Sequence, residues 1–336
     1  MQNTIAQFAI IICMVMLTGC DWFDDKAEVA PEHEAFLLTD RHPQNVKLQQ
    51  QLANTLSNEQ LYQRALSLWP VAYRELNVPT SLGQARIIVA GPVDAQPVVL
   101  LHGMHANSAM WYPNVATLAE HFRVYAVDDL LGSGGSQASA DISDMSQLVR
   151  WYQELFEQLQ LDSIHLVGAS RGGWQAVAIA LAESKIESSR IQRLVLLSPA
   201  QTFAWVEFST DLLASIFFTL NPERAKVQDS LQSVSSRPEL IHPVYLDQYV
   251  AALEHDPVPD LIMAMRPFSE QQLQQITVPT LVMIGDEDMM NDQDSLEQAK
   301  KLLPQAHTLQ VKNAGHFLTV DQAELVNNEV VRFLSK

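Results

Sequence analysis

The sequence predicts an α/β fold with a mostly parallel, doubly wound sheet and an inserted helical cap. Continuous apolar runs, typical of strands buried on both faces, alternate with helical patterns along the chain. A Gly-x-Ser-x-Gly motif, Gly168 to Gly172, stands between one such run and a helix of small residues. No glycine occurs between Gly173 and Gly285, and the part of this stretch at about residues 200–275 has helical periodicity without strands.

Length and composition limit the class of protein. The chain has 336 residues, of which 47% are hydrophobic, and a formal net charge of -18. A chain of this length can bury a sizeable core, but its acidity leaves no basic patch for a phosphate backbone. We therefore expect no nucleic-acid partner. The two cysteines, Cys13 and Cys20, form neither a CxxC motif nor a Cys/His pair at metal spacing, which predicts neither a disulfide framework nor a metal site.

Residues 1–19 have the pattern of an export signal. Ile5 to Leu17 is almost wholly apolar and is shorter than the ~20 residues that span a bilayer, which is typical of a signal-peptide core. The next residues, Thr18-Gly19-Cys20, complete a motif that resembles the lipobox of bacterial lipoprotein signal peptides. That resemblance implies cleavage after Gly19 and acylation of Cys20. An uncleaved anchor and an ordinary secretory signal are the alternatives, because no Lys or Arg precedes the apolar run.

The predicted lipid anchor implies a location outside the cytoplasm. Residues 20–47 are polar and mostly acidic without sustained periodicity, which predicts a tether between the membrane and the folded domain, residues 48–336. We expect the domain to face the periplasm or the cell exterior. In a Gram-negative cell, Asp21 resembles the signal that retains lipoproteins at the inner membrane. Cleavage would remove Cys13 and acylation would block Cys20, which suits an oxidising compartment.

The folded domain is expected to begin with a helix that starts at a capping box. Ser57-Asn58-Glu59-Gln60 has the Ser-x-x-Gln form of that motif, and the helical segment ends at Pro70. Apolar runs after it predict strands at 85–90, 97–101, 123–127, the run that precedes Gly168, 194–197, 280–284 and 308–311. Helical patterns lie between them at 114–122, 145–159, 176–182, 292–303 and 321–334.

The Gly-x-Ser-x-Gly motif makes Ser170 the candidate nucleophile. A sharp strand-to-helix turn needs glycines on both sides, and its backbone strain would push the serine hydroxyl out above the sheet. The helix N-terminus that follows favours negative charge. The same letters also occur in ordinary turns, so the hypothesis needs a base and an acid elsewhere in the chain.

Candidates for the base and the acid follow the last two predicted strands. His316 is the candidate base, because Gly315-His316 stands just after the final strand and before the final helix. Asp288 is the candidate acid, with Asp286 as the alternative, because both follow the strand that ends near Gly285. The resulting chain order of Ser, Asp and His is that of α/β-hydrolases.

The chain resembles the α/β-hydrolase superfamily over about Leu82 to Phe333. Within it, five stretches resemble bacterial carboxylesterases of the naproxen esterase type: Leu68-Trp69-Pro70-Val71, Gly83-Gln84-Ala85, Val98-Val99-Leu100-Leu101-His102-Gly103, Met110-Trp111-Tyr112-Pro113-Asn114 and Leu197-Ser198-Pro199-Ala200. The resemblance implies a serine esterase for small to medium esters, acting through an acyl-enzyme without a cofactor. A lipase, a C–C hydrolase, a perhydrolase and a non-catalytic binding lipoprotein are the alternatives, since fold does not fix substrate.

The resemblance also implies further site residues. The backbone N–H groups of Met104 and Arg171 are expected to form the oxyanion hole. Asp129-Leu130-Leu131-Gly132-Ser133-Gly134-Gly135-Ser136 resembles a scaffold loop of the superfamily, although Asp128 leaves its register open. Arg171 departs from the family pattern, in which an apolar residue follows the nucleophile. Its side chain could attract an acidic substrate, but we expect it to pair with a carboxylate of the cap.

The cap is rich in large apolar side chains, most of which we expect to form its own core and some to line a substrate pocket. These residues are Phe203, Trp205, Phe208, Leu212, Leu213, Ile216, Phe217, Phe218, Met263, Met265 and Phe268. The histidines near the motifs, His102, His105 and His165, do not have the position of a base, and His102 is expected to be structural.

Overall fold

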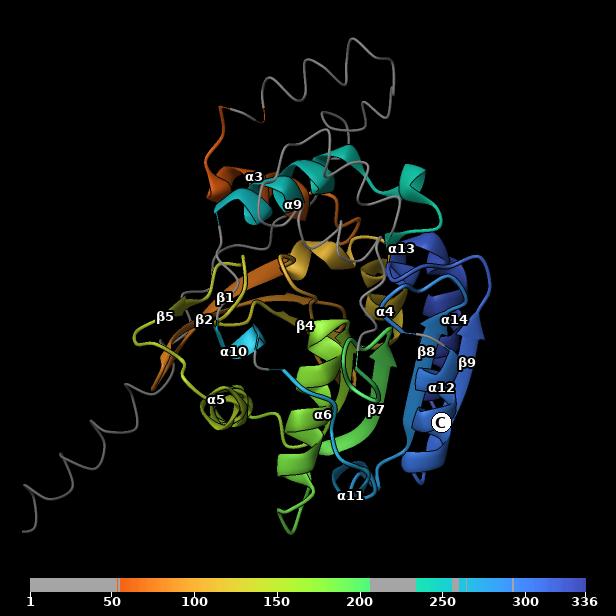
Figure 1. Ribbon diagram of the computed structural model, residues 1–336. Coiled ribbons are helices and arrows are strands. Elements are labelled where there is room, and N and C mark those ends of the chain that lie inside the picture. Colours follow the sequence, from red (N-terminus) through yellow and green to blue (C-terminus); the bar gives the residue numbers. More distant parts are fainter. Residues whose placement is uncertain (1–52, 54, 206–233, 256–259, 264, 292) are drawn as a thin grey trace, which may run out of the picture.

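A sheet flanked by helices forms the centre of the computed structural model, which describes residues 53, 55–205, 234–255, 260–263, 265–291 and 293–336 (Figure 1). The predicted signal peptide, Cys20 and the tether lie outside these residues, as do Phe208, Leu212, Leu213, Ile216, Phe217, Phe218 and the side chain of Met263. Among the helices that are described, none has the length and apolar character needed to cross a membrane.

The strands form one sheet in the order β1-β2-β4-β3-β6-β7-β8-β9, with β5 paired to β2. Pairing is antiparallel from β1 to β4 along this order and parallel from β4 to β9. The sheet is therefore mostly parallel, as predicted. The strands are β1 (Tyr73–Thr80), β2 (Gly83–Ala90), β3 (Pro97–Leu101), β4 (Arg123–Val127), β5 (Gln137–Ala138), β6 (Ile164–Ala169), β7 (Ile191–Leu197), β8 (Thr280–Gly285) and β9 (Ala306–Val311).

Helices cover both faces of the sheet. Along β3, Val98 and Leu100 belong to one buried cluster and Val99 and Leu101 to the other, so an apolar strand supplies both cores. The α-helices are α3 (Asn58–Leu66), α4 (Val115–His121), α5 (Met145–Gln158), α6 (Arg171–Glu183), α9 (Pro243–His255), α10 (Asp260–Met263), α11 (Glu270–Leu273), α12 (Gln293–Leu302), α13 (Leu318–Asp321) and α14 (Ala323–Leu334). α4 and α14 pack on the first cluster; α5, α6 and α12 pack on the second.

The predicted strands are all present, but β1 and β5 were not predicted. Among the described strands, β1 lies at the edge of the sheet and pairs with β2 alone. Its pattern of burial is irregular, so its sequence shows neither regular alternation nor a continuous apolar run. It also contains Pro79, which an edge strand tolerates because one side needs no backbone donor. β5 has only two residues, too few to form a pattern.

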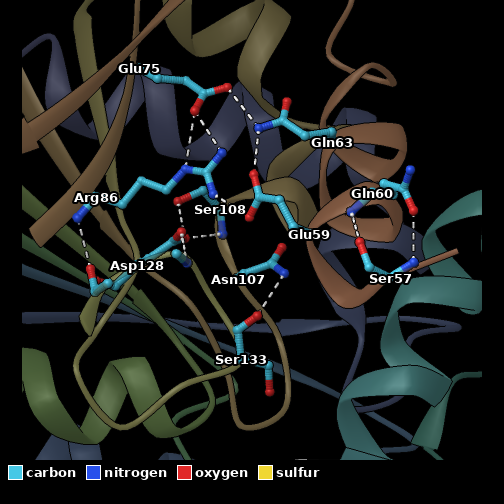
Figure 2. Close-up of polar contacts among 12 residues, drawn as sticks. Ser57, Glu59, Gln60, Gln63, Glu75, Arg86, Asn107, Ser108, Asp128 and Ser133 are labelled. Carbon is cyan, nitrogen blue, oxygen red and sulfur yellow. Dashed lines mark hydrogen bonds and ion pairs between the residues drawn. The ribbon is translucent and has the colours of Figure 1, made fainter. Parts of the chain in front are cut away.

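The capping box at the start of α3 is present as predicted. The Ser57 hydroxyl accepts from the Gln60 N–H at 3.3 Å, and the Gln60 side chain accepts from the Ser57 N–H at 2.9 Å (Figure 2). α3 is tied to the sheet by Arg86 of β2, whose guanidinium lies 2.6 Å from Glu75 and 3.0 Å from Glu59. These contacts attach the N-terminal helix to the antiparallel end of the sheet.

Residues 198–279, between β7 and β8, form the insertion. Its described residues contain α9, α10, α11 and a short 3-10 helix, Pro238–Leu240, and no strand. α9 packs beside α3 (Figure 1). Four of the apolar side chains predicted for the cap are described. Phe203 and Met265 are buried, and Phe268 packs against the core. Trp205 is 62% exposed and does not belong to the core.

Candidate active site

Ser170 lies at the turn from β6 to α6 in a strained backbone conformation. Its φ of 52° and ψ of -120° fall outside the regions that residues with a Cβ ordinarily adopt. The turn closes tightly because a Cβ on Gly172 would lie 2.2 Å from the carbonyl oxygen of Leu101, and one on Gly168 would lie 2.2 Å from that of Gly172. The local geometry therefore matches the predicted nucleophile turn.

The three predicted catalytic side chains form one series of hydrogen bonds. His316 Nε2 lies 2.8 Å from Ser170 Oγ, and His316 Nδ1 lies 2.9 Å from Asp288 Oδ1. An ionised carboxylate only accepts, so Nδ1 bears the proton and Nε2 accepts from the serine hydroxyl. All three residues follow the carboxyl ends of parallel strands, β6, β8 and β9, which meet at one edge of the sheet.

Asp288 is buried, and its surroundings stabilise the charged form. Met290 N–H donates to Oδ1 at 2.9 Å, and the Asn291 amide donates to Oδ2 at 3.0 Å. Burial opposes ionisation, but the neighbouring His316 and these hydrogen bonds outweigh it and hold the pKa of Asp288 below its ordinary value. Asn291 was missed from the sequence; its only signal is an amide side chain three residues after the acid.

Asp286, the alternative acid, does not contact His316. It is exposed, and its Oδ1 accepts from Ala314 N–H at 3.3 Å. A Cβ on Gly285 would lie 2.1 Å from the Ala314 carbonyl oxygen, so the loops after β8 and β9 lie in close contact. The structure therefore brings Asp288, rather than Asp286, to the imidazole, and Asp286 joins the two loops.

The loop after β3 lies against the candidate nucleophile. A Cβ on Gly103 would be 3.4 Å from Ser170 Cβ, and the Gly103 N–H donates to Met110 Sδ at 3.4 Å. The next N–H along this loop belongs to Met104. Arg171 is the first residue of α6, where the helix leaves the N–H without an intrahelical acceptor. Met104 directly follows Gly103, and Arg171 directly follows Ser170. The two predicted oxyanion-hole residues thus follow two residues that lie against each other.

His102 links this loop to the loop after β4. Its Nε2 accepts from Asp129 N–H at 3.1 Å, because a backbone N–H can only donate. The Nδ1 must then bear the proton, which it donates to the Gly103 carbonyl oxygen at 2.8 Å. His102 therefore has a structural role as predicted. His105 and His165 are also buried, and neither takes part in the hydrogen bonds of Ser170.

The side chain of Arg171 is buried and pairs with Asp129 rather than with a carboxylate of the insertion. Its Nη2 lies 2.6 Å from Asp129 Oδ2, and its Nη1 donates to the Leu131 carbonyl oxygen at 3.3 Å. The expectation of a partner in the cap was wrong, because the long side chain lies against the loop after β4, where Asp129 is the second residue after the strand. Gln175 of α6 donates to the same carboxylate oxygen at 2.9 Å.

Asp129 stays ionised in this buried position. Burial alone would raise its pKa, but the charge of Arg171, the neighbouring His102 and the hydrogen bonds it accepts hold the pKa below the ordinary value. Asp128 is also buried and accepts from Ser108 N–H at 2.8 Å and from Gly135 N–H at 2.7 Å (Figure 2). The glycine-rich loop thus folds around both carboxylates, which fits the scaffold role predicted for it.

We searched the part of the chain that the structure describes for side chains that could bind a metal ion. No group of three or more His, Cys, Asp or Glu side chains there could hold a metal ion.

Comparisons with known proteins show the family to which the chain is related. The alpha/beta hydrolase family matches residues 98–329. Carboxylesterase YbfK of Bacillus subtilis (strain 168) is 34% identical over 285 residues, covering 82% of this chain and 92% of the relative. The uncharacterized carboxylesterase nap of the same strain is 30% identical over 294 residues, covering 84% and 93%.

Solved structures are similar over the same extent. The crystal structure of naproxen esterase (carboxylesterase NP) from B. subtilis matches with a TM-score of 0.76 and 29% identity, covering 82% of this chain and 96% of that one. Carboxylesterase CesB (YbfK) from B. subtilis matches with a TM-score of 0.72 and 32% identity, covering 86% and 98%.

Proposed function

This chain belongs to the alpha/beta hydrolase family, is a hydrolase with carboxylesterase relatives, and we propose that it cleaves small to medium esters through an acyl-enzyme on Ser170. The observation that supports this most directly is the hydrogen-bonded series from Ser170 through His316 to Asp288. A nucleophile, a base within 2.8 Å of it and a carboxylate that orients the base are the groups that acyl transfer requires.

In the proposed acylation, Ser170 Oγ attacks the carbonyl carbon of the ester while His316 Nε2 takes the hydroxyl proton. The carbonyl oxygen becomes an oxyanion, which accepts hydrogen bonds from the N–H groups of Met104 and Arg171. When the bond to the alcohol breaks, His316 returns the proton to the leaving oxygen. A water then attacks the acyl-enzyme, again with His316 as base, and releases the acid and free Ser170.

Asp288 has an electrostatic part in this proposal. Its lowered pKa keeps it ionised at neutral pH, so it holds the imidazole with Nε2 toward Ser170 and stabilises the imidazolium that forms. The donors from Met290 and Asn291 satisfy the lone pairs that His316 does not use.

The test is Ser170→Ala in the purified folded domain. We expect hydrolysis of short-chain p-nitrophenyl esters to fall by about 10³-fold or more, because no other group accepts the acyl chain. Labelling by a fluorophosphonate should map to Ser170 in the wild type and be lost in the variant. Circular dichroism and the melting temperature control for folding. A Ser170→Ala variant that keeps wild-type turnover would refute the proposal.

We further propose that Cys20 carries the acyl chains of a lipoprotein and that the domain works outside the cytoplasm, held at the membrane. The support is the apolar run and lipobox-like motif at residues 5–20 and the acidic tether after them. Two or three acyl chains would anchor the chain firmly, at ~0.8 kcal/mol per buried CH₂. Asp21 favours the inner membrane if the cell is Gram-negative.

A further inference from the structure

A short segment of the insertion, Val234–Arg237, lies directly on the loop that bears His316. The N–H of Phe317 donates to the Val234 carbonyl oxygen at 3.1 Å. On the other side of His316, a Cβ on Gly315 would lie 2.8 Å from that same oxygen. The residues before and after the proposed base therefore both contact Val234.

Asp321, at the end of α13, joins the same two parts of the chain. It is 1% exposed, and its Oδ2 accepts from Gly315 N–H at 2.8 Å and from Ser236 N–H at 3.0 Å. Its Oδ1 accepts from the Ser235 hydroxyl and from Arg237 N–H at 3.3 Å. One buried carboxylate thus receives four donors, three from the insertion and one from the residue next to His316.

A carboxylate matches this set of donors. Three of the four are backbone N–H groups, which can only donate, and a carboxylate offers about four acceptor positions. An amide in its place would turn its NH₂ toward at least one backbone N–H in either orientation. That N–H is Arg237 in one orientation, and Gly315 and Ser236 in the other. The chemistry of the cluster therefore favours Asp321 over its isosteric amide, although neither side chain touches Ser170.

The position of His316 matters to a fraction of an ångström. A base must lie within hydrogen-bond reach of the proton it takes, and misplacement by ~1 Å can cost about 100-fold in rate. Gly315 is the residue directly before His316, so the hydrogen bond from its N–H to Asp321 restrains the backbone from which the imidazole extends.

We propose that Asp321 is a positioning residue that fixes the His316 loop against the insertion and so keeps the imidazole between Asp288 and Ser170. This inference rests on the proposed role of His316 as the base. The insertion then takes part in positioning the base, because a displacement of Val234–Arg237 is transmitted through Asp321 to His316. Substrates that alter the seating of this segment change turnover as well as binding.

The test compares Asp321→Asn and Ser235→Ala with Asp247→Asn as a matched control. Asp247 is a buried carboxylate of the insertion, on α9, paired with Arg64 at 3.6 Å. We expect Asp321→Asn to lower kcat by about 10- to 100-fold, with KM changed much less, because the base is misplaced rather than the substrate lost. Ser235→Ala should act in the same direction with a smaller effect, and it decides the matter if Asp321→Asn does not fold.

A spectroscopic readout separates positioning from stability. The downfield proton resonance of the Nδ1–H shared by His316 and Asp288 should shift or broaden in Asp321→Asn. Asp247→Asn should lower the melting temperature and leave both this resonance and kcat at wild-type values. Unchanged kcat and resonance in folded Asp321→Asn, or an equal loss of kcat in Asp247→Asn, would overturn the inference.

The same assays include His316→Ala. If His316→Ala is inactive while Asp321→Asn is fully active, only the positioning role fails. If His316→Ala itself keeps wild-type activity, the proposed function fails.

Discussion

Arg171 places a buried positive charge one residue after the proposed nucleophile, and Asp129 neutralises it at 2.6 Å. Through Asp129 and His102 the pair is connected to the loop of Gly103. A departure from the usual apolar residue is tolerated here because the charge is paired and hydrogen-bonded within the scaffold. The buried side chain therefore joins the start of α6 to the loop after β4.

Replacing Arg171 with Met should destabilise the protein strongly. The change leaves Asp129 buried without its cation, so the pKa of Asp129 should rise and the free energy of unfolding should fall by about 3–5 kcal/mol, as measured by urea denaturation. The double variant Arg171→Met, Asp129→Asn removes both charges and should be more stable than Arg171→Met alone. A loss confined to a few tenths of a kcal/mol in the single variant would contradict this account.

The two aspartates after β8 should differ in their effect on catalysis. Asp288→Asn keeps the volume but removes the acceptor that fixes the His316 tautomer, so kcat/KM should fall by about 10³- to 10⁴-fold. Asp286→Asn changes only a loop contact to Ala314 and should cost less than about tenfold. Steady-state kinetics on a p-nitrophenyl ester measures both. The opposite ranking would transfer the role of the acid to Asp286.

At the scale of single elements, β6 is followed directly by the strained Ser170, and the strand also contains a buried histidine, His165. Burial, and next the charge of Arg193, lower the pKa of His165 to about 4. An unfolded histidine titrates near 6.5, so between about pH 4 and 6.5 the unfolded chain binds more protons than the folded one. The contribution of His165 to the free energy of unfolding is thus complete above about pH 6.5 and is lost as the pH falls toward 4.

Removing this histidine should flatten the acid side of the stability profile. In the wild type, as the pH falls from about 6.5 to 4, protonation of His165 in the unfolded chain should lower the free energy of unfolding by up to about 1.4 kcal/mol per pH unit. His165→Gln should lose that slope while the slope below pH 4, which belongs to the carboxylates, persists. Urea denaturation at a series of pH values measures it, and an unchanged slope between pH 4 and 6.5 would exclude His165 as its source.

For the whole molecule, the proposed anchor separates location from catalysis. Ser170 and its partners lie in the folded domain, whereas the proposed attachment depends on Cys20, which precedes the proposed acidic tether. The two functions should therefore be lost independently. The domain without residues 1–47 should keep its esterase activity.

Cys20→Ala should abolish metabolic labelling with a radioactive fatty acid and leave a precursor uncleaved at Gly19. The reason is that the thiol is the proposed acceptor of the lipid, on which both the proposed acylation and the proposed cleavage depend. Ser170→Ala serves as the matched control, since it should label normally and remain in the membrane fraction. Unmodified wild-type protein in the cytosol would refute the anchor. Recovery in an outer-membrane fraction would refute only the inner-membrane retention attributed to Asp21.

The sequence by itself determined the features that contiguous residues encode. Strands β3 and β4 were predicted at their observed bounds, since an apolar run buried on both faces leaves little choice of structure. The turn at Ser170 and the capping box at Ser57 are local motifs whose hydrogen bonds or strain involve near neighbours. β1 was missed because an edge strand needs no distinctive pattern.

Only the tertiary structure decided between partners that lie far apart in the chain. The sequence favoured Asp288 and left Asp286 as the alternative, and the packing of the loops after β8 and β9 brings Asp288 to His316. The pairing of Arg171 with Asp129 and the three donors from the insertion to Asp321 likewise join segments separated by tens of residues. Such contacts depend on the order and register of the strands, and short-range patterns do not specify which side chains that order brings together.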